Sequence, residues 1–286
     1  MSEVVALLAC HNRKDRTTAC LTSLFDQDVP GHEIEAILID DGSSDGTADA
    51  VLALFDKVEV IRGSGSLFWA RSMALAEQRA MRRSPDYLLW LNDDVVLYRY
   101  ALRTLFEARN QSTDARIVVG SLVDPEVGCP TYGGVERVDW HPMRYALVAP
   151  ADGTPRPCTT FNGNVVLVPR PVYRELGGID GRFSHAYADF DYGLRARALG
   201  FDLIVTGTAV GTCAHGRAAV WEEPSLSLAT RYRLLLGRKG VPTGSSARYL
   251  RRHGGRLWPI YFLATYLKVG GKHVLARVPF PWAERG

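Results

Sequence analysis

Two adjacent carboxylates, Asp93 and Asp94, directly follow a short apolar run that we expect to form a buried strand. Neighbouring carboxylates at such a place repel each other and lose part of their hydration. A hard divalent cation would relieve both costs, because Mg²⁺ and Mn²⁺ bind carboxylate oxygens together with the phosphate oxygens of a substrate. The pair is therefore a candidate Mg²⁺ or Mn²⁺ site. The alternative is a polar loop in which Asp94 caps a helix.

Three further polar clusters each follow a predicted strand: His11-Asn12, Asp40-Asp41 and Gly63–Ser66. Strand patterns alternate with helical patterns through about residue 110, which predicts an open, mostly parallel sheet with right-handed crossovers. Ligands of such sheets bind beyond the carboxyl ends of the strands. We therefore expect the clusters to meet at one rim. The strands are predicted at Val4–Ala9, Glu35–Ile39, Val58–Ile61 and Tyr87–Leu91, and the helices at Asp15–Phe25, Thr47–Phe55 and Phe68–Arg82.

The rest of the chain has a weaker periodic pattern. Residues 124–160 are rich in Gly, Pro and aromatic residues and are predicted to be irregular, with a hairpin around Tyr132–Leu147. Past Val220 the pattern is helical and basic. Together these features predict an α/β domain over residues 1–216 and a basic helical region over 217–286. Further elements are expected as strands at Ile117–Val123, Val165–Val168 and Asp202–Val205, a loop at Gly177–Ala188 and a helix at Asp189–Leu199.

An ordered set of motifs resembles the family-2 glycosyltransferases, which have the GT-A fold, a mostly parallel Rossmann-like sheet flanked by helices. The resemblance covers residues 4 to about 215, and Gly65-Ser66-Leu67-Phe68-Trp69 is similar to the branch with bacterial rhamnosyl- and galactofuranosyltransferases. The motifs are His11-Asn12-Arg13, Ile39-Asp40-Asp41-Gly42-Ser43-Ser44-Asp45-Gly46-Thr47, Leu91-Asn92-Asp93-Asp94-Val95, Phe161-Asn162-Gly163-Asn164 and Asp189-Phe190-Asp191-Tyr192-Gly193-Leu194-Arg195-Ala196.

The resemblance implies roles for individual residues. Asp41 would accept a hydrogen bond from the nucleotide base, and Asp93 would contact the ribose, or the metal through water. Asp94 would bind the metal directly, and Asn12 belongs with the donor-binding residues. Asp189 would be the catalytic base that takes the proton of the acceptor hydroxyl, so that this oxygen attacks the anomeric carbon in line.

Three further site candidates each have a structural alternative. Asp191 is the rival of Asp189 at the acceptor, but it lies four residues before Arg195 on one helical face, where an ion pair is expected. His215 would complete the metal site, as a histidine near this point does in relatives, or it is an ordinary loop residue. His185 would contact the diphosphate or acceptor, or it is an exposed loop histidine.

The glycine turn Gly63–Ser66 does not match the dinucleotide-binding pattern, because that pattern needs a third glycine where this chain has Phe68. We instead expect Gly65 and Arg71 near the donor diphosphate, where backbone amides and a guanidinium bind phosphate oxygens. Trp69 would shape the sugar pocket, or it is a packing residue. Asn162 and Asn164 carry amides suited to sugar hydroxyls, with a simple β-turn as the alternative.

Positive charge is concentrated near the C-terminus. The whole chain has a net charge of +3, whereas residues 217–286 hold thirteen Lys/Arg and three Asp/Glu, a net charge of +10. The aromatic-rich run Trp258–Leu267 is too short to span a bilayer. It fits a helix lying on an anionic membrane surface, or a helical region that packs on the core or on a second copy in a homodimer. We expect no nucleic-acid binding, because no recognition motif accompanies the charge.

The sequence thus predicts a metal-dependent inverting glycosyltransferase that uses a nucleotide-diphosphate sugar, with dTDP-rhamnose favoured by the branch, and a glycan or lipid-linked acceptor in bacterial cell-surface polysaccharide synthesis. Galactofuranosyl or other hexosyl transfer from a UDP-sugar is the alternative. A nucleotidyltransferase would need a glycine-rich loop after the first strand, and this chain has none there. A non-catalytic sugar-binding module would have lost Asp94 or Asp189, and both are present. The N-terminus lacks signal-peptide features and the five cysteines include no CxxC pair, which favours a cytoplasmic protein, peripheral at the inner face of the membrane.

Overall fold

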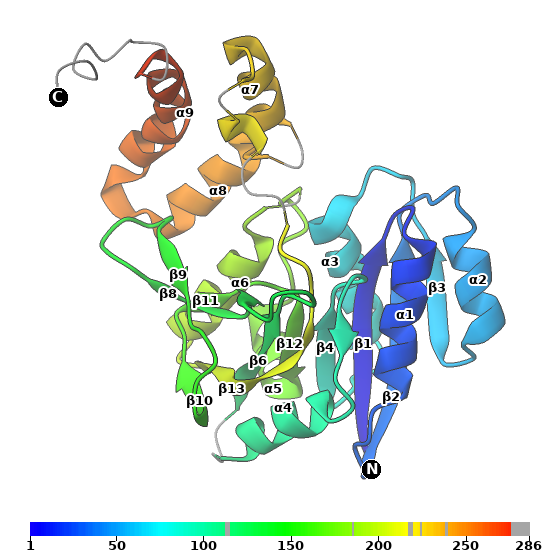
Figure 1. Cartoon of the computed structure of the whole chain (residues 1–286). Helices are drawn as coiled ribbons and strands as arrows, with labels where there is room; N and C mark the ends of the chain where they lie inside the picture. Colours follow the sequence, from blue (N-terminus) through cyan, green and yellow to red (C-terminus); the bar gives the residue numbers. More distant parts are fainter. Residues whose placement is uncertain (112–114, 185, 217–219, 224, 238–239, 276–286) are drawn as a thin grey trace, which may run out of the picture. The chain divides into compact units, whose positions relative to one another are not determined.

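The chain forms two compact units, Met1–His215 and Gly216–Gly286 (Figure 1). The computed structural model describes residues 1–111, 115–184, 186–216, 220–223, 225–237 and 240–275.

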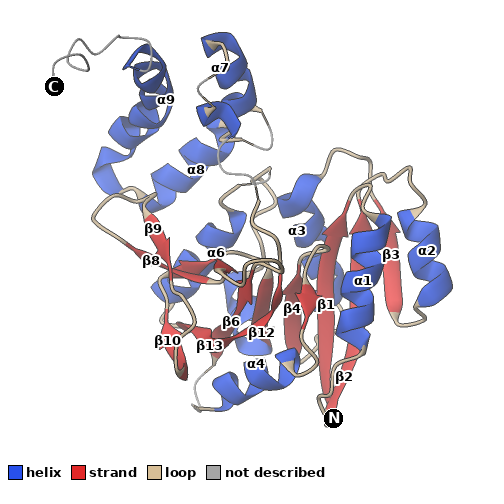
Figure 2. Cartoon of the chain, viewed as in Figure 1, coloured by secondary structure: helices blue, strands red, loops and turns tan. Residues whose placement is uncertain are grey.

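A mixed sheet forms the centre of the first unit, with the strand order β10-β13-β6-β12-β4-β1-β2-β3 in the described residues. Six of these strands run in one direction, because β12 is antiparallel to both β4 and β6 and β10 is antiparallel to β13. Helices flank the sheet (Figure 2), so the predicted mostly parallel α/β fold is confirmed. The strands are β1 (Ser2–Cys10), β2 (His32–Asp40), β3 (Val58–Arg62), β4 (Tyr87–Leu91), β6 (Arg116–Val123), β10 (Gly153–Pro157), β12 (Val165–Pro169) and β13 (Asp202–Thr212).

The winding of the first half creates the place for a site. The chain adds β2 and then β3 on one side of β1, and it returns to place β4 on the other side. Right-handed crossovers therefore put α1 (Lys14–Phe25) and α2 (Thr47–Leu54) on one face and α3 (Phe68–Met81) on the other. Such a reversal opens a crevice at the carboxyl ends of the two strands where it occurs, here β1 and β4.

The central strands are apolar on both faces, as buried parallel strands require. Val4 to Leu8 of β1 are fully buried. Leu8 belongs to a cluster with Leu21 and Leu24 of α1 and with Leu102 of α4 (Ala101–Asn110). This packing makes the strand ends rigid supports for the polar loops that follow them.

The second half departs from the sequence prediction in several elements, among them β10, which pairs with β13 although residues 124–160 were expected to be irregular outside the hairpin. The helix α5 (Arg170–Leu176) was not expected, although Pro171 in its first turn and Gly177 at its end, with φ +72°, are typical helix boundaries. Strand β13 continues to Thr212 rather than ending at Val205, because it resumes pairing with β6 after register shifts between Val205 and Gly211. The expected hairpin is present as β8 (Gly134–Arg137) and β9 (Tyr145–Leu147).

The remaining elements of the first unit are small except for α6. They are β5 (Val96–Leu97), β7 (Pro130–Tyr132), β11 (Thr160–Phe161) and α6 (Ala188–Ala198).

The second unit is helical in its described residues, as the sequence predicts. Ser227 caps α7 (Leu228–Leu236) by accepting a hydrogen bond from the Thr230 amide at 3.2 Å. The hydroxyl of Tyr266 on α9 (Trp258–Leu275) donates to the Val241 carbonyl at 3.1 Å. Within the part of the chain that the structure describes, no helix is both long and apolar enough to cross a bilayer. The other elements are α8 (Thr243–His253), η1 (Val220–Glu222) and η2 (Gly255–Leu257).

Candidate active site

The loop after β1 is tied to the loop after β2. Asn12 has a left-handed backbone, with φ 52°, and its side-chain oxygen accepts a hydrogen bond from the Ser44 amide at 2.8 Å. The Asn12 amide donates to the Ser43 hydroxyl at 2.9 Å. The Nδ1 atom of His11 lies 2.7 Å from the Asp41 carbonyl oxygen and donates to it. Asn12 thus fixes the shape of the rim in this structure.

Asp41 joins the β2 end to the glycine turn after β3. The carboxylate is buried, and its two oxygens accept hydrogen bonds from the amides of Gly65 at 2.8 Å and Phe68 at 2.9 Å. The approach is so close that a side chain on Gly42, whose φ is +74°, would meet the Gly65 backbone at 2.9 Å. Only glycine fits both the space and the backbone conformation at position 42.

Arg13 bridges the two carboxylates after β4. Its Nη1 atom lies 2.9 Å from Asp93 Oδ1 and 2.9 Å from Asp94 Oδ2. Sequence reasoning did not assign Arg13 to the site. The available signal was topological: once the chain reverses across β1, the β1 and β4 ends must be neighbours, and Arg13 is the cation at one of them.

The carboxylate pair is chemically suited to a divalent cation. Burial raises the pKa of Asp93 to about 6, against the opposing attraction of Arg13. Asp93 Oδ2 is buried and has no hydrogen-bond partner among the described residues. The Cys213 thiol lies 3.7 Å from Asp94 Oδ1. A hard cation prefers such an oxygen pair, and an orphaned buried carboxylate oxygen is costly without one. The residues present therefore fit Mg²⁺ or Mn²⁺.

His215 lies two residues beyond Cys213, and its ring stacks on Tyr132 with the centroids 5.7 Å apart. Among the residues that the structure describes, no group of three or more His, Cys, Asp or Glu side chains is arranged to hold a metal ion. A cation at Asp93 and Asp94 would therefore need oxygen ligands from a substrate as well.

Asp189 lies in the first turn of α6 against the loop after β11. Its Oδ2 accepts a hydrogen bond from the Gly163 amide at 3.1 Å, and its Oδ1 accepts one from the Phe190 amide at 2.9 Å. Burial raises the pKa of Asp189 to about 6. A carboxylate with this pKa is ionised at neutral pH and is a stronger base than an ordinary aspartate.

Trp69 connects the carboxylate pair to Asp189. Its ring nitrogen donates to the Asn92 side-chain oxygen at 2.7 Å. A side chain on Gly163 would come within 2.8 Å of the Trp69 ring and 3.3 Å of Asp189 Cβ. Asp41 holds the amide of Phe68, next to Trp69, and Asn92 directly precedes Asp93, so contacts and chain neighbours together connect Asp41, the carboxylate pair and Asp189. The structure thus places these acidic groups on one connected rim.

The asparagines beside Gly163 differ in exposure. Asn162 is partly exposed, and its amide donates to the Gly133 carbonyl at 3.0 Å. Asn164 is buried, and its carbonyl accepts the Asn92 amide at 2.9 Å. Asn164 therefore positions the loop, whereas the Asn162 side chain is accessible.

The remaining candidate residues, Asp191, Arg71 and His185, differ in their surroundings. Asp191 is fully buried and pairs with Arg195 at 2.9 Å, which is the ion pair that their spacing predicts. Arg195 also donates to the carbonyls of Leu176 and Gly178. Arg71 is exposed on α3. His185 lies outside the described residues.

The buried carboxylate of Glu77, which the sequence analysis did not identify, connects two of the helices that carry site residues. Glu77 on α3 accepts hydrogen bonds from the Ile179 amide at 2.7 Å and from the Tyr192 hydroxyl at 3.2 Å. Burial raises the pKa of Glu77 to about 7. Glu77 links the helix that carries Trp69 to the helix that carries Asp189. Its place inside an apolar helix face was the available signal.

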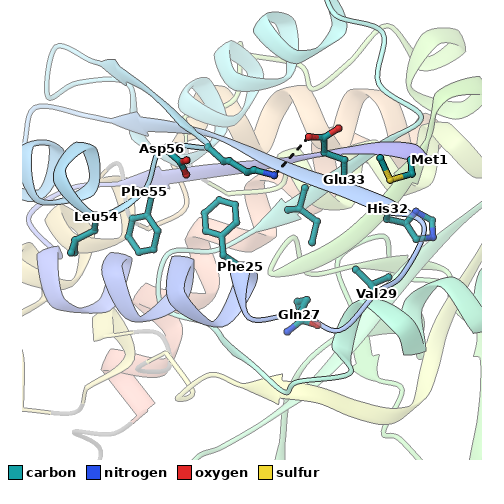
Figure 3. Close-up of a pocket in the computed structure, with 11 residues that line it drawn as sticks. Met1, Phe25, Gln27, Val29, His32, Glu33, Leu54, Phe55 and Asp56 are labelled. Carbon is teal, nitrogen blue, oxygen red and sulfur yellow. Dashed lines mark ion pairs between the residues drawn. The ribbon is translucent and has the colours of Figure 1, made fainter.

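A surface cavity of about 560 Å³ lies away from this rim (Figure 3). Its lining includes His32 at the start of β2 and Asp56 just before β3. These are the amino ends of the strands, so the cavity is at the opposite edge of the sheet. Phe25 and Phe55 stack within it, with centroids 5.6 Å apart. Its lining does not include the acidic groups of the rim.

Comparison with solved structures identifies the fold. A mannosyltransferase, PcManGT from Pyrobaculum calidifontis, was solved in complex with GDP-Man and Mn²⁺; it has 15% identity and a TM-score of 0.57, covering 96% of this chain and 73% of that chain. TarS residues 1–349 of S. aureus have 14% identity and a TM-score of 0.58, covering 96% and 88%. The same TarS segment in complex with UDP has 14% identity and a TM-score of 0.58, covering 97% and 81%. These likenesses show the GT-A fold.

A search of curated protein sequences found no match. The model of one protein family, described as glycosyl transferase family 2, matches residues 6–173, which is more than half of the sequence. The chain therefore belongs to glycosyl transferase family 2.

Proposed function

We propose that this chain is a metal-dependent inverting transferase that moves a sugar from a nucleoside diphosphate to an acceptor hydroxyl. The observation that carries the proposal is that Trp69 hydrogen-bonds Asn92, the residue before Asp93 and Asp94, and packs at Gly163, whose amide donates to Asp189. This proximity supports a cation-binding pair and a base that would act at one reaction centre. The transferase domain would span residues 1–216.

On the donor side, Asp94 would hold Mg²⁺ or Mn²⁺ with Asp93 beside it, and His215 would be an additional ligand. When bound, the metal would neutralise the charge that develops on the diphosphate as this leaving group separates from the anomeric carbon. Asp41 and Asn12 would shape the pocket for the nucleoside. Gly65 and Arg71 would face the diphosphate.

On the acceptor side, Asp189 would accept the proton of the attacking hydroxyl. Its two hydrogen bonds from backbone amides fix the carboxylate orientation, and its raised pKa of about 6 makes it an effective base near neutral pH. Trp69 and Asn162 would contact the sugar or acceptor, and His185 remains a candidate on this side. Asp191 and Asn164 would act by positioning α6 and the loop.

The donor that we favour is dTDP-rhamnose, on the branch resemblance of the Gly65–Trp69 segment, with UDP-galactofuranose or another UDP-hexose as the alternative. The acceptor would be a glycan or a lipid-linked glycan in cell-surface polysaccharide synthesis. A panel of nucleotide sugars, each with and without Mn²⁺, tests this assignment by thermal shift and by product formation. We expect dTDP-rhamnose with Mn²⁺ to give the largest shift and a product whose anomeric configuration is opposite to that of the donor. Retention of configuration would contradict the inverting mechanism.

The basic helical region 217–286 would bind an anionic lipid surface. Helix α9 exposes Ile260, Leu263 and Leu267, at 61%, 58% and 69% of their surface, on one helical face, while Tyr261 and Val269 are buried on the other. Exposed cations lie at both ends of the aliphatic face, at Arg256 and Lys268. An aliphatic face bordered by cations is typical of helices that lie in a membrane interface.

Co-sedimentation with vesicles tests this surface. The full chain should pellet with vesicles containing phosphatidylglycerol and remain in solution with phosphatidylcholine alone. Changing Leu263 and Leu267 to Glu should abolish pelleting while transfer to a soluble acceptor persists. A concentration-dependent dimer that the same changes dissociate, without vesicle binding, would assign the face to a second copy instead.

A further inference from the structure

The Arg13 side chain forms ion pairs with both Asp93 and Asp94. One Nη1 atom contacts both carboxylates at 2.9 Å. Of the four carboxylate oxygens, two contact Arg13, Asp94 Oδ1 contacts the Cys213 thiol, and the buried Asp93 Oδ2 has no partner among the described residues. A metal ion at this pair would be repelled by the guanidinium charge, and it would compete directly with the guanidinium for Asp93 Oδ1 and Asp94 Oδ2.

The backbone of Arg13 is fixed, whereas its side chain has room to move. Its carbonyl accepts the Thr17 amide at 2.8 Å in the first turn of α1, and the preceding Asn12 is held by Ser43 and Ser44. The Arg13 side chain is 42% exposed, against 6% for Asp93 and 25% for Asp94. Release of the carboxylates therefore needs only a rotation of one side chain towards solvent.

We propose that Arg13 is an internal counterion that makes metal binding depend on the donor. This inference rests on the proposed metal-dependent function. Without a diphosphate, Arg13 keeps the pair neutralised and disfavours a free cation. With a diphosphate present, the guanidinium gains an anionic partner, because its planar array of N–H donors matches phosphate as well as carboxylate. The guanidinium then moves off the carboxylates, and the metal ion can bind them.

The coupling must be reciprocal, because the effect of one ligand on the binding of the other is a single free energy. The diphosphate strengthens Mn²⁺ binding by the same factor by which Mn²⁺ strengthens diphosphate binding. Part of that factor belongs to Arg13 and is lost when its charge is removed. The remainder comes from direct contact between the metal and the phosphates and persists.

The test measures Mn²⁺ binding by the electron paramagnetic resonance signal of the free ion. The full-length wild type and the Arg13→Met variant are each titrated alone and with saturating UDP or dTDP. Without nucleotide, Arg13→Met should bind Mn²⁺ at least about tenfold more tightly, the size expected for one unit charge a few Å away near a protein surface. The enhancement by the nucleotide should be smaller in the variant than in the wild type.

Arg16→Met is the matched control. Arg16 is exposed on α1 and contributes only a distant attraction to Asp93, so its removal should change Mn²⁺ affinity by less than threefold, as expected for a screened surface charge. Adding Asp94→Asn to Arg13→Met should eliminate the tight Mn²⁺ binding. Survival of tight binding in that double variant would place the ion elsewhere and overturn the inference. Arg13→Gln provides a second variant if Arg13→Met loses the wild-type circular dichroism spectrum.

Two failures are distinguishable. If Mn²⁺ binds the wild type with a nucleoside diphosphate but Arg13→Met and Arg13→Gln bind the free ion no more tightly than the wild type, the role of Arg13 is wrong and the proposed function stands. If Mn²⁺ binds neither wild type nor variants under any of these conditions, the metal-dependent function itself is wrong, and the role of Arg13 is wrong with it.

Discussion

Asp93 and Asp189 have pKa values raised by burial to the same level, about 6, yet their surroundings differ. Asp93 faces a cation, Arg13, and one of its oxygens has no hydrogen-bond partner in the part of the chain that the structure describes. Asp189 accepts hydrogen bonds from two backbone amides, Gly163 and Phe190. In the proposed function, the first carboxylate would therefore face a positive ion and the second would accept a proton. Perturbed pKa values cluster at functional sites, and the neighbouring atoms indicate which chemistry each group could serve.

Asp94→Ala should have the largest effect, because it removes a direct oxygen ligand of the proposed cation. We expect sugar transfer to fall by about 10³-fold or more, in line with the several kcal/mol that a metal supplies to a transition state. Mn²⁺ with a nucleoside diphosphate should raise the melting temperature of the wild type and not of the variant. A wild-type rate in Asp94→Ala would contradict a metal-binding role for the carboxylates at Asp93 and Asp94, and with it the contrast with Asp189.

Asp189→Asn should abolish proton acceptance while leaving the donor side intact. The expected loss in rate is about 10²- to 10⁴-fold, the usual contribution of a general base. The Mn²⁺-dependent thermal shift with a nucleoside diphosphate should be retained, in contrast to Asp94→Ala. Asp202→Asn is the control, because Asp202 is exposed at the start of β13, and full activity is expected there.

Gly163→Ala should disturb the spacing between Trp69 and Asp189. The added methyl group would lie 2.8 Å from the Trp69 ring and 3.3 Å from Asp189 Cβ, and a displacement of about 1 Å in a site can reduce the rate about 10²-fold. Transfer should decrease while nucleotide binding persists. Gly181→Ala, whose nearest neighbour would be Ala74 Cβ at 3.4 Å, is the matched control and should keep its activity.

The pH profile should show the smallest effect. Asp189 would have to be deprotonated to act, and its pKa is about 6, so the rate should be nearly constant above pH 7 and fall about fivefold between pH 6 and pH 5. Because this pKa is raised on folding, the ionised carboxylate lowers stability, and the loss develops as the pH rises from about 4 to 6. Asp189→Asn should therefore melt at a higher temperature than the wild type at pH 7. An equal or lower melting temperature would show that the carboxylate is not a source of strain.

The first half of the fold was predictable because each strand contains a short, mostly apolar run that a polar cluster follows. Tyr87–Leu91 has the bounds that its sequence predicts. The convergence of Asp41 and Asp94 followed from the same logic, since parallel strands end at one edge. The contacts of Glu77 and the ion pairs of Arg13 were not predicted from the sequence, because both depend on which elements become neighbours after folding. The continuation of β13 was missed because Thr206-Gly207-Thr208 interrupts its apolar pattern at the register shift.

The buried Glu77 has a mechanical consequence. It sits on α3 eight residues after Trp69, and it accepts the hydroxyl of Tyr192, three residues after Asp189 on α6. The two helices are thus coupled through one short polar link in otherwise apolar surroundings. We expect this link to resist displacement of α3 relative to α6, and so to keep Trp69 and Asp189 at a fixed separation.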